Sequence, residues 1–159
     1  ENMKAWHFVS DTLRDGTLIP PDGEALIYKG PLVLCQSGLH ASIDPFDALQ
    51  YALGDTLCQV ECGGKIIQST DKLVCSERTI IKRMYAKEML FYFARMQALS
   101  VVHLWEAPDV VLDYLMTGDQ SIRAAARESA WASAMASARE SGRASARADF
   151  NALVKECFA

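Results

Sequence analysis

The pattern of hydrophobic and polar positions changes near residue 86. Before it, short runs rich in β-branched and aromatic residues are separated by Gly, Pro and Asp, as in strands joined by turns. After it, apolar residues recur every three to four positions, as on one face of a helix. The pattern predicts an α+β fold: a small mixed or antiparallel sheet with one inserted helix, then packed helices and a long C-terminal Ala/Arg-rich helix.

Short strands are predicted throughout the first part of the chain. Asp15-Gly16 and Pro20-Pro21-Asp22-Gly23 indicate a loop, because Pro fixes φ and Gly permits positive φ. Gly63-Gly64 predicts a hairpin turn between two of the strands. The predicted strands are 4–9, 25–28, 32–35, 56–61, 65–68, 72–75 and 79–85.

Helix boundaries are indicated by capping residues. Asp44-Pro45-Phe46-Asp47 predicts the start of the inserted helix, since Asp44 can cap it and Pro suits the first helical position. A second helix is predicted from Lys87, with Met89, Phe93, Met96 and His103 on one stripe. Pro108 ends it and opens a third helix, which stops before Gly118.

The C-terminal arm is a low-complexity array of small residues. Because Ala is the best helix former, we predict a helix from Gln120 to Ala148 with Gly142 as its weak point; one helix and a hairpin at Gly142 both remain open. The small side chains would allow a homodimer through this helix. The residues that recur every fourth position are Arg123, Arg127, Trp131, Met135, Arg139, Arg143 and Arg147.

The expected organisation is a β-rich head over 1–85, a helical pair packed on it over 86–118, and the arm over 119–159. Residues 1–119 carry ten Lys and Arg against sixteen Asp and Glu, whereas residues 120–159 carry six against four. An acidic head with a mildly basic arm makes nucleic acid an unlikely partner. Charges interrupt every apolar run well before the roughly 20 residues that cross a bilayer, so we expect a cytoplasmic protein without membrane contact.

The five cysteines are expected to be free thiols in a reducing compartment. Cys58 and Cys62 fall on one predicted strand, where residues four apart are separated by about 13 Å, too far to share a metal ion. We expect them to be small buried hydrophobic side chains. No metal and no resident cofactor is predicted.

Several motifs in the head resemble an uncharacterised family found in phages and prophages. They are Cys35-Gln36-Ser37-Gly38-Leu39-His40-Ala41, Asp47-Ala48-Leu49-Gln50-Tyr51 and Val60-Glu61-Cys62-Gly63-Gly64. The Ala/Arg-rich tail resembles those appended to some of its members. The resemblance implies no established activity.

A looser resemblance is to the ADP-ribosyltransferase fold. The matching positions are His7, the run Gly38-Leu39-His40-Ala41, Tyr51 and Glu77. The resemblance implies that His7 holds the ribose of the cofactor, that an aromatic residue or His40 stacks near the nicotinamide, and that Glu77 stabilises the developing oxocarbenium charge. A structural interpretation stays open, in which His40 is a hydrogen-bonded core histidine and His7 points away from the core.

Binding of a protein partner is the leading functional hypothesis. A phage-type cytosolic protein of this kind suits antagonism of a bacterial defence system, including an anti-CRISPR role, through Trp131, Arg139, Arg143 and Arg147. Whether the chain is an enzyme stays open. The alternative is an ADP-ribosyltransferase-like enzyme, or a non-catalytic nucleotide-binding sponge, using a cleft around His7, His40, Tyr51 and Glu77.

Overall fold

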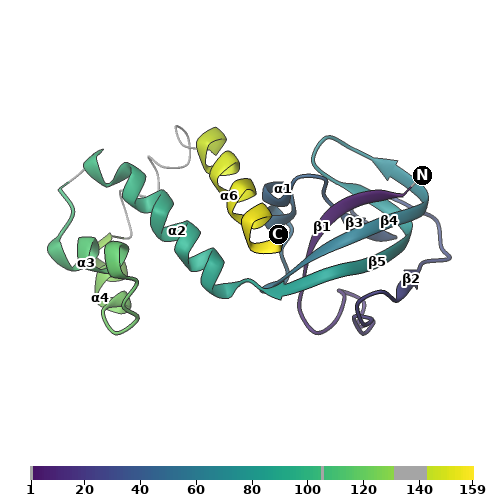
Figure 1. Cartoon of the computed structure of the whole chain (residues 1–159), viewed down its shortest axis with the longest axis horizontal. Coiled ribbons are helices and arrows are strands. Elements are labelled where there is room, and N and C mark those ends of the chain that lie inside the picture. The colour runs from purple at the N-terminus through teal and green to yellow at the C-terminus, as the bar shows by residue number, and fades with distance from the viewer. Residues whose placement is uncertain (1, 105, 131–142) are drawn as a thin grey trace. The chain divides into compact units, whose positions relative to one another are not determined.

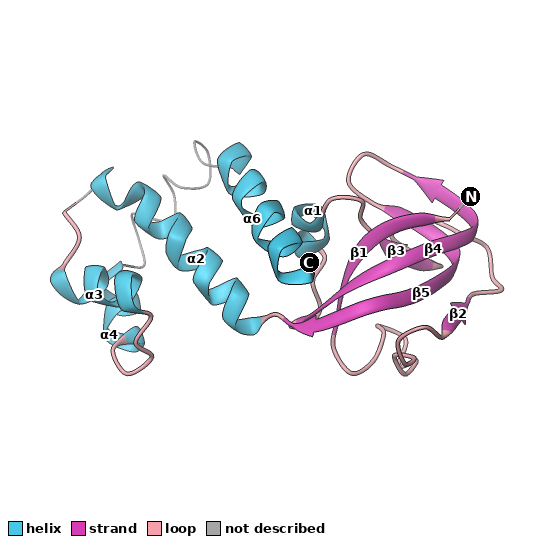
Figure 2. Ribbon diagram, viewed as in Figure 1, coloured by secondary structure: helices cyan, strands magenta, loops and turns pink. Residues whose placement is uncertain are grey.

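The chain folds into two compact units of the expected α+β class (Figures 1 and 2). The computed structural model describes residues 2–104, 106–130 and 143–159. Unit 1 consists of Glu1–Lys87 with Asn151–Ala159, and unit 2 is Glu88–Phe150. The described residues of unit 1 form an antiparallel sheet of five strands.

Two long strands form the centre of that sheet. Its order is β1-β4-β5-β2, and β3 pairs with β5 further along the same strand. All strand pairs are antiparallel, so of the two predicted sheet types, mixed and antiparallel, the sheet is the antiparallel one. The strands are β1 (Met3–Val9), β2 (Ala25–Ile27), β3 (Leu39–Ala41), β4 (Thr56–Gln68) and β5 (Leu73–Tyr85).

The predicted hairpin at Gly63-Gly64 is wrong. β4 runs straight through both glycines, and its register against β5 shifts between Gly63 and Ile66, where an irregularity interrupts the ladder. Gly64 has a φ of 66°, and the N–H of Lys65 leaves the ladder to donate to Ser76 Oγ at 2.8 Å. A positive-φ glycine therefore serves a bulge here rather than a turn.

Two other strand predictions need correction. The runs 72–75 and 79–85 are joined in the single strand β5, because β2 and β4 both pair with the intervening Glu77 and Arg78. The predicted strand at 32–35 is a tight turn in which Val33 and Ser37 exchange backbone hydrogen bonds at 2.9 Å. Cys35 in this turn has a φ of 65°, which is incompatible with a strand.

The inserted helix begins as predicted. In α1 (Pro45–Gln50), Asp44 Oδ1 accepts the N–H of Phe46 at 2.8 Å. The end of α6 (Arg143–Phe158) also binds here, since Asn151 Nδ2 donates to Asp44 Oδ2 at 2.7 Å. The Trp6 and Phe158 rings meet edge to face at 5.1 Å between centroids, so the C-terminal end packs against β1.

One buried cluster of unit 1 lies on the face of the sheet that carries Ala5 and Val9. Its buried members include Cys58, Cys62 and Cys75, which have no disulfide partner. The prediction that Cys58 and Cys62 are buried side chains is confirmed. The other buried residues of this cluster are Ala5, Val9, Leu39, Ala41, Val60, Leu73 and Ile80.

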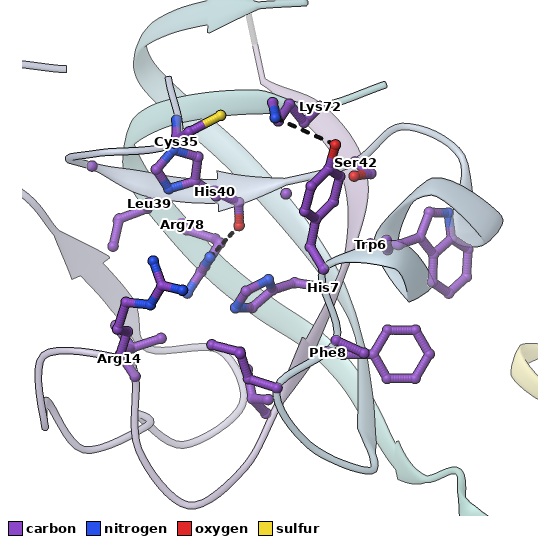
Figure 3. Close-up of a pocket in the computed structure, with 18 of the residues that line it drawn as sticks. Trp6, His7, Phe8, Arg14, Cys35, Leu39, His40, Ser42, Lys72 and Arg78 are labelled. Carbon is purple, nitrogen blue, oxygen red and sulfur yellow. Dashed lines mark hydrogen bonds between the residues drawn. The ribbon is translucent and has the colours of Figure 1, made fainter. Parts of the chain in front are cut away.

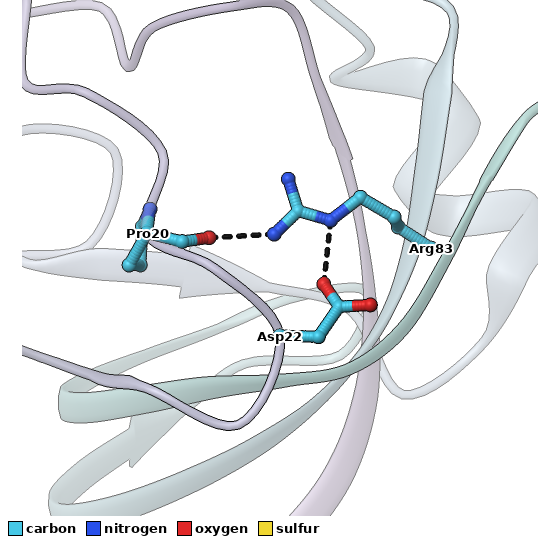
Figure 4. A network of polar contacts seen from close by, with 3 residues as sticks. All are labelled: Pro20, Asp22 and Arg83. Carbon is cyan, nitrogen blue, oxygen red and sulfur yellow. Dashed lines mark hydrogen bonds and ion pairs between the residues drawn. The ribbon is translucent and has the colours of Figure 1, made fainter.

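The long loop between β1 and β2 is tied to β5 by Arg83 (Figure 4). Arg83 Nε donates to Asp22 Oδ1 and another guanidinium nitrogen donates to the Pro20 carbonyl, both at 2.5 Å. The N–H of Gly23 adds a bond to the Ile80 carbonyl at 2.8 Å. These bonds fix the second half of a loop whose first half carries Arg14 and Asp15.

Unit 2 is helical. Its elements are α2 (Lys87–Val101), the 3-10 turn η1 (Val102–Leu104), α3 (Asp109–Thr117) and α4 (Arg123–Ala130). Val111, Leu115 and Ala126 form one buried cluster of its described residues. The predicted stop at Gly118 is confirmed, since this residue caps α3 with a φ of 72°. His103 is exposed.

The predicted arm helix over 120–148 is described only in part. Residues 123–130 belong to α4 and residues 143–148 to α6, while 131–142, including Gly142, lie outside the described residues. Phe150 and Val154 of α6 are fully buried. None of the helices in the described ranges has the length and apolar character needed to cross a membrane.

Replacing Gly64 with Ala should destabilise unit 1 more than replacing Gly16 with Ala. Both glycines have positive φ, which costs an alanine about 1–2 kcal/mol. A Cβ at Gly64 would also overlap Ser76 Oγ, whereas a Cβ at Gly16 meets no atom within 4 Å. Urea unfolding should show G64A losing about 1 kcal/mol more than G16A. Equal losses of stability in G64A and G16A would contradict the expected clash between a Cβ at position 64 and Ser76 Oγ.

Candidate functional site

A pocket of about 750 Å³ opens in unit 1 (Figure 3). Strand β1, the loop after it, the turn before β3, the end of α1 and β5 all contribute to its walls. Its polar and charged lining includes His7, Arg14, Asp15, Cys35, His40, Ser42, Tyr51, Lys72 and Arg78. Segments that are far apart in the sequence therefore converge on one cavity.

Arg78 is the most deeply buried charge of the pocket, with 5% of its surface exposed. One guanidinium nitrogen donates to the His40 carbonyl (Figure 3). No carboxylate of the described part of the chain forms an ion pair with Arg78. Burial lowers the pKa of Arg78, but a guanidinium stays protonated in proteins, so a largely uncompensated positive charge faces the cavity.

His7 reaches the pocket from β1 because side chains alternate along the strand. Its neighbours Trp6 and Phe8 point to the opposite side, while its ring faces the part of the pocket that holds Arg78 (Figure 3). Burial, then the charge of Arg78 and the proximity of His40, hold the pKa of His7 well below its usual value. His7 is therefore neutral at neutral pH.

His40 supports the turn that precedes β3. Its Nε2 accepts the backbone N–H of Cys35 at 2.9 Å, and the ring also hydrogen-bonds to the Gly38 backbone. Burial lowers the pKa of His40, aided by the charges of Arg78, Lys72 and Arg14, although the Gly38 bond acts in the opposite direction. The neutral ring is the form that can accept the Cys35 N–H.

The rim of the pocket carries a second polar network. Tyr51 Oη donates to the Asp71 carboxylate and accepts from Lys72 Nζ at 3.3 Å. Lys72 Nζ also lies 4.6 Å from the Tyr51 ring centroid. Hydrogen bonds to the side chains of Cys35 and then Tyr51 raise the pKa of Lys72. The network keeps the Lys72 ammonium at the pocket entrance, with the Asp71 carboxylate on the other side of Tyr51 Oη.

Asp15 is the one carboxylate among the described residues that line the pocket. It accepts the backbone N–H of Thr17 at 3.0 Å, and this bond lowers the pKa of Asp15. Three cations, Arg14, Lys72 and Arg78, therefore face a single carboxylate. With both histidines neutral, the lining has a net charge of +2, the balance of those three cations and one anion.

Three of the four residues predicted for the cleft line this pocket, namely His7, His40 and Tyr51. Glu77 is not among the lining residues and is exposed. It precedes Arg78 on β5, and neighbouring residues of a strand point to opposite faces. The open question about His40 resolves toward its hydrogen-bonded, turn-supporting form, while His7 faces the cavity.

Little of the predicted partner-binding set is described. Trp131 and Arg139 lie outside the described residues, and Arg143 is described only as the first residue of α6. Arg147 is half-buried in α6. The predicted surface therefore stays a prediction.

Sequence reasoning missed Arg14, Cys35, Lys72 and Arg78 as pocket residues. One signal could have identified Arg78. It is a single arginine between the apolar positions Cys75 and Ile80 of a strand. The other three depend on contacts between distant segments and leave no local pattern.

The fold and the pocket together define a small α+β domain with a cationic cavity. Residues 3–91 match the Domain of unknown function (DUF7666) family, and because the match spans more than half of the chain, the protein belongs to that family. Neither curated proteins nor solved structures provide a match. The expected membership in an uncharacterised family is confirmed, and the matched range contains every pocket residue named above.

Stability should fall as the pH drops from 7.5 to 5.5. In the folded chain burial keeps His7 and His40 neutral, whereas in the unfolded chain they take up protons near their ordinary pKa of about 6.5. Stability is therefore complete above that value and decreases below it, by up to about 1 kcal/mol per histidine. Urea unfolding at both pH values measures the loss.

Two variants identify the source of this pH dependence. The H7Q/H40Q double variant should lose most of the pH dependence, while H103Q, which changes an exposed histidine of unit 2, should keep it. If the free energy of unfolding changes equally with pH in wild type and in both variants, other groups cause the pH dependence.

Proposed function

We propose that the pocket of unit 1 binds a small anionic ligand of the nucleotide type and releases it unchanged. The observation that carries this proposal is Arg78, a buried guanidinium that faces a cavity without a carboxylate partner. Removing a charge from water costs several kcal/mol unless an opposite charge offsets it. An anion in the pocket would supply that opposite charge.

The surroundings of Arg78 support an anionic ligand. Arg14 and Lys72 add two cations, and their mutual repulsion with Arg78 would be relieved by a negative group between them. Guanidinium groups suit phosphate because their planar N–H donors can bind two oxygens at once. A volume of about 750 Å³ falls within the range of small-molecule sites.

Binding without turnover is favoured over ADP-ribosyl transfer. Such a transfer needs a carboxylate near the developing positive charge of the ribose, and Glu77 was the predicted residue. Because Glu77 is absent from the lining, the chain lacks the acid in the place that the resemblance implied. Asp15, on the loop after β1, is held by Thr17 and lies among cations.

Antagonism of a bacterial defence system, an anti-CRISPR role included, stays a proposal, as does a phage origin. A pocket that retains a nucleotide would serve such an antagonist by removing it from solution. Capture of a protein partner through Trp131 and the arginines of the arm is a separate form of the same proposal. Charge reversal at Arg139, Arg143 and Arg147 tests it, since an undiminished pull-down would contradict it.

Replacing Arg78 with Met should weaken nucleotide binding. Charge-assisted hydrogen bonds contribute about 1.5–3 kcal/mol each, so the affinity should fall at least about tenfold. Calorimetric titration of the full chain with AMP, ADP-ribose and NAD measures the change. K65Q is the control, because it removes one exposed cation of unit 1 that does not line the pocket. Equal affinity in R78M and wild type would overturn the proposal, and release of nicotinamide from NAD would replace it with the enzyme.

The same R78M variant should fold at least as stably as wild type. Exchanging a buried charge for an apolar side chain of similar volume is often neutral or stabilising by about 1–4 kcal/mol. The lost bond to the His40 carbonyl offsets about 1 kcal/mol of this gain. Thermal unfolding without ligand checks the expectation. A large loss of stability would indicate that Arg78 serves the fold and not a ligand.

A further inference from the structure

We infer that the part of the pocket around Arg78 is a site for a dianionic phosphate monoester, and that His7 takes up a proton when the dianion binds. This inference rests on the proposed function and deepens it, because it names the charge state of the ligand group and the protein group that responds to it. It is carried by the placement of Arg14, Arg78 and His7 around one part of the cavity (Figure 3).

Arg78 is built to receive an acceptor group. It uses one N–H for the His40 carbonyl, and a guanidinium has five, so several donors remain directed at the cavity. Figure 3 shows the side chain of Arg14 pointing into the same part of the pocket. Two guanidinium groups without a carboxylate between them repel each other, and a phosphate placed between them can accept hydrogen bonds from both.

The charge of the lining indicates a dianion. Arg14, Lys72 and Arg78 against Asp15 leave a net charge of +2 while the histidines are neutral. A terminal phosphate monoester carries close to two negative charges above its second pKa of about 6. A phosphodiester carries one negative charge for each phosphate and would leave part of the positive charge of the lining uncompensated.

His7, and not His40, is the group that can accept a proton. Nε2 of His40 already accepts the backbone N–H of Cys35 at 2.9 Å, and the ring also interacts with the Gly38 backbone. Protonating His40 would convert the acceptor of the Cys35 N–H into a donor and break that bond. Within the described ranges the His7 ring makes no hydrogen bond, and it lines the cavity, so both nitrogens remain available.

The coupling follows from the charges around His7. Without a bound anion, the pKa of His7 is lowered by burial, by the charge of Arg78 and by the proximity of His40. Arg14 and Lys72 add further positive charge to the lining, and Asp15 is the opposing carboxylate. A dianion beside Arg78 outweighs that positive charge and favours the protonated imidazole. Linkage then requires that a fall in pH strengthens binding.

Calorimetric titration of the full chain with AMP tests the inference. At pH 7.5 the phosphate of AMP is already almost fully dianionic, so protons taken up on binding belong to the protein. Comparing the binding heat in Tris and in PIPES, two buffers of different ionisation enthalpy, should reveal net proton uptake. Cyclic 3′,5′-AMP is the matched probe, because it keeps the base and ribose but has a monoanionic phosphodiester. It should bind about tenfold or more weakly.

The H7Q variant separates this inference from the proposed function. It should still bind AMP through Arg14 and Arg78, with reduced affinity and without proton uptake. H103Q, which changes an exposed histidine of unit 2, should retain proton uptake when AMP binds. Binding of AMP without proton uptake in wild type, or equal binding of cyclic AMP, would overturn the inference and leave the proposed function standing. No binding of either probe, of ADP-ribose or of NAD would overturn both.

Discussion

Pairing between β4 and β5 is the interaction on which the rest of unit 1 depends. Both strands are 13 residues long, and β5 also provides the ladder for β2 and β3. Since side chains alternate along a strand, the register of β5 decides at once which residues enter the core and which enter the pocket. It separates Glu77, which is exposed, from Arg78, which is buried beside the cavity.

Local signals explain why much of the fold was predictable. The cap at Asp44 and the helix end at Gly118 are decided by a few adjacent residues, and both predictions are confirmed. The hairpin predicted at Gly63-Gly64 failed because a turn and a bulge both use glycine at positive φ. Pairing with the neighbouring strand distinguishes a bulge from a turn, and the local sequence does not reveal which strands pair.

The pocket shows the same limit at the level of single side chains. His7, His40 and Tyr51 were identified from sequence, but Glu77 was placed in the cleft in place of its neighbour Arg78. An error of one residue reverses the face of a strand and, in this case, the sign of the charge. Lys72 and Cys35 meet at the rim because a turn and a strand converge there, a contact that neither segment reveals alone.

The two pocket histidines differ because of what surrounds them. His40 is neutral and its nitrogens are committed to the backbone, so it holds Cys35 in a left-handed conformation that is costly for a residue with a side chain. His7 is neutral as well, but burial and neighbouring positive charge, rather than hydrogen bonds, keep it so. A bound anion would offset the positive charge near His7 but would leave the backbone hydrogen bonds of His40 unchanged. The turn before β3 is thus fastened by His40, while His7 lines the same cavity without such a bond and remains able to respond to a charge placed there.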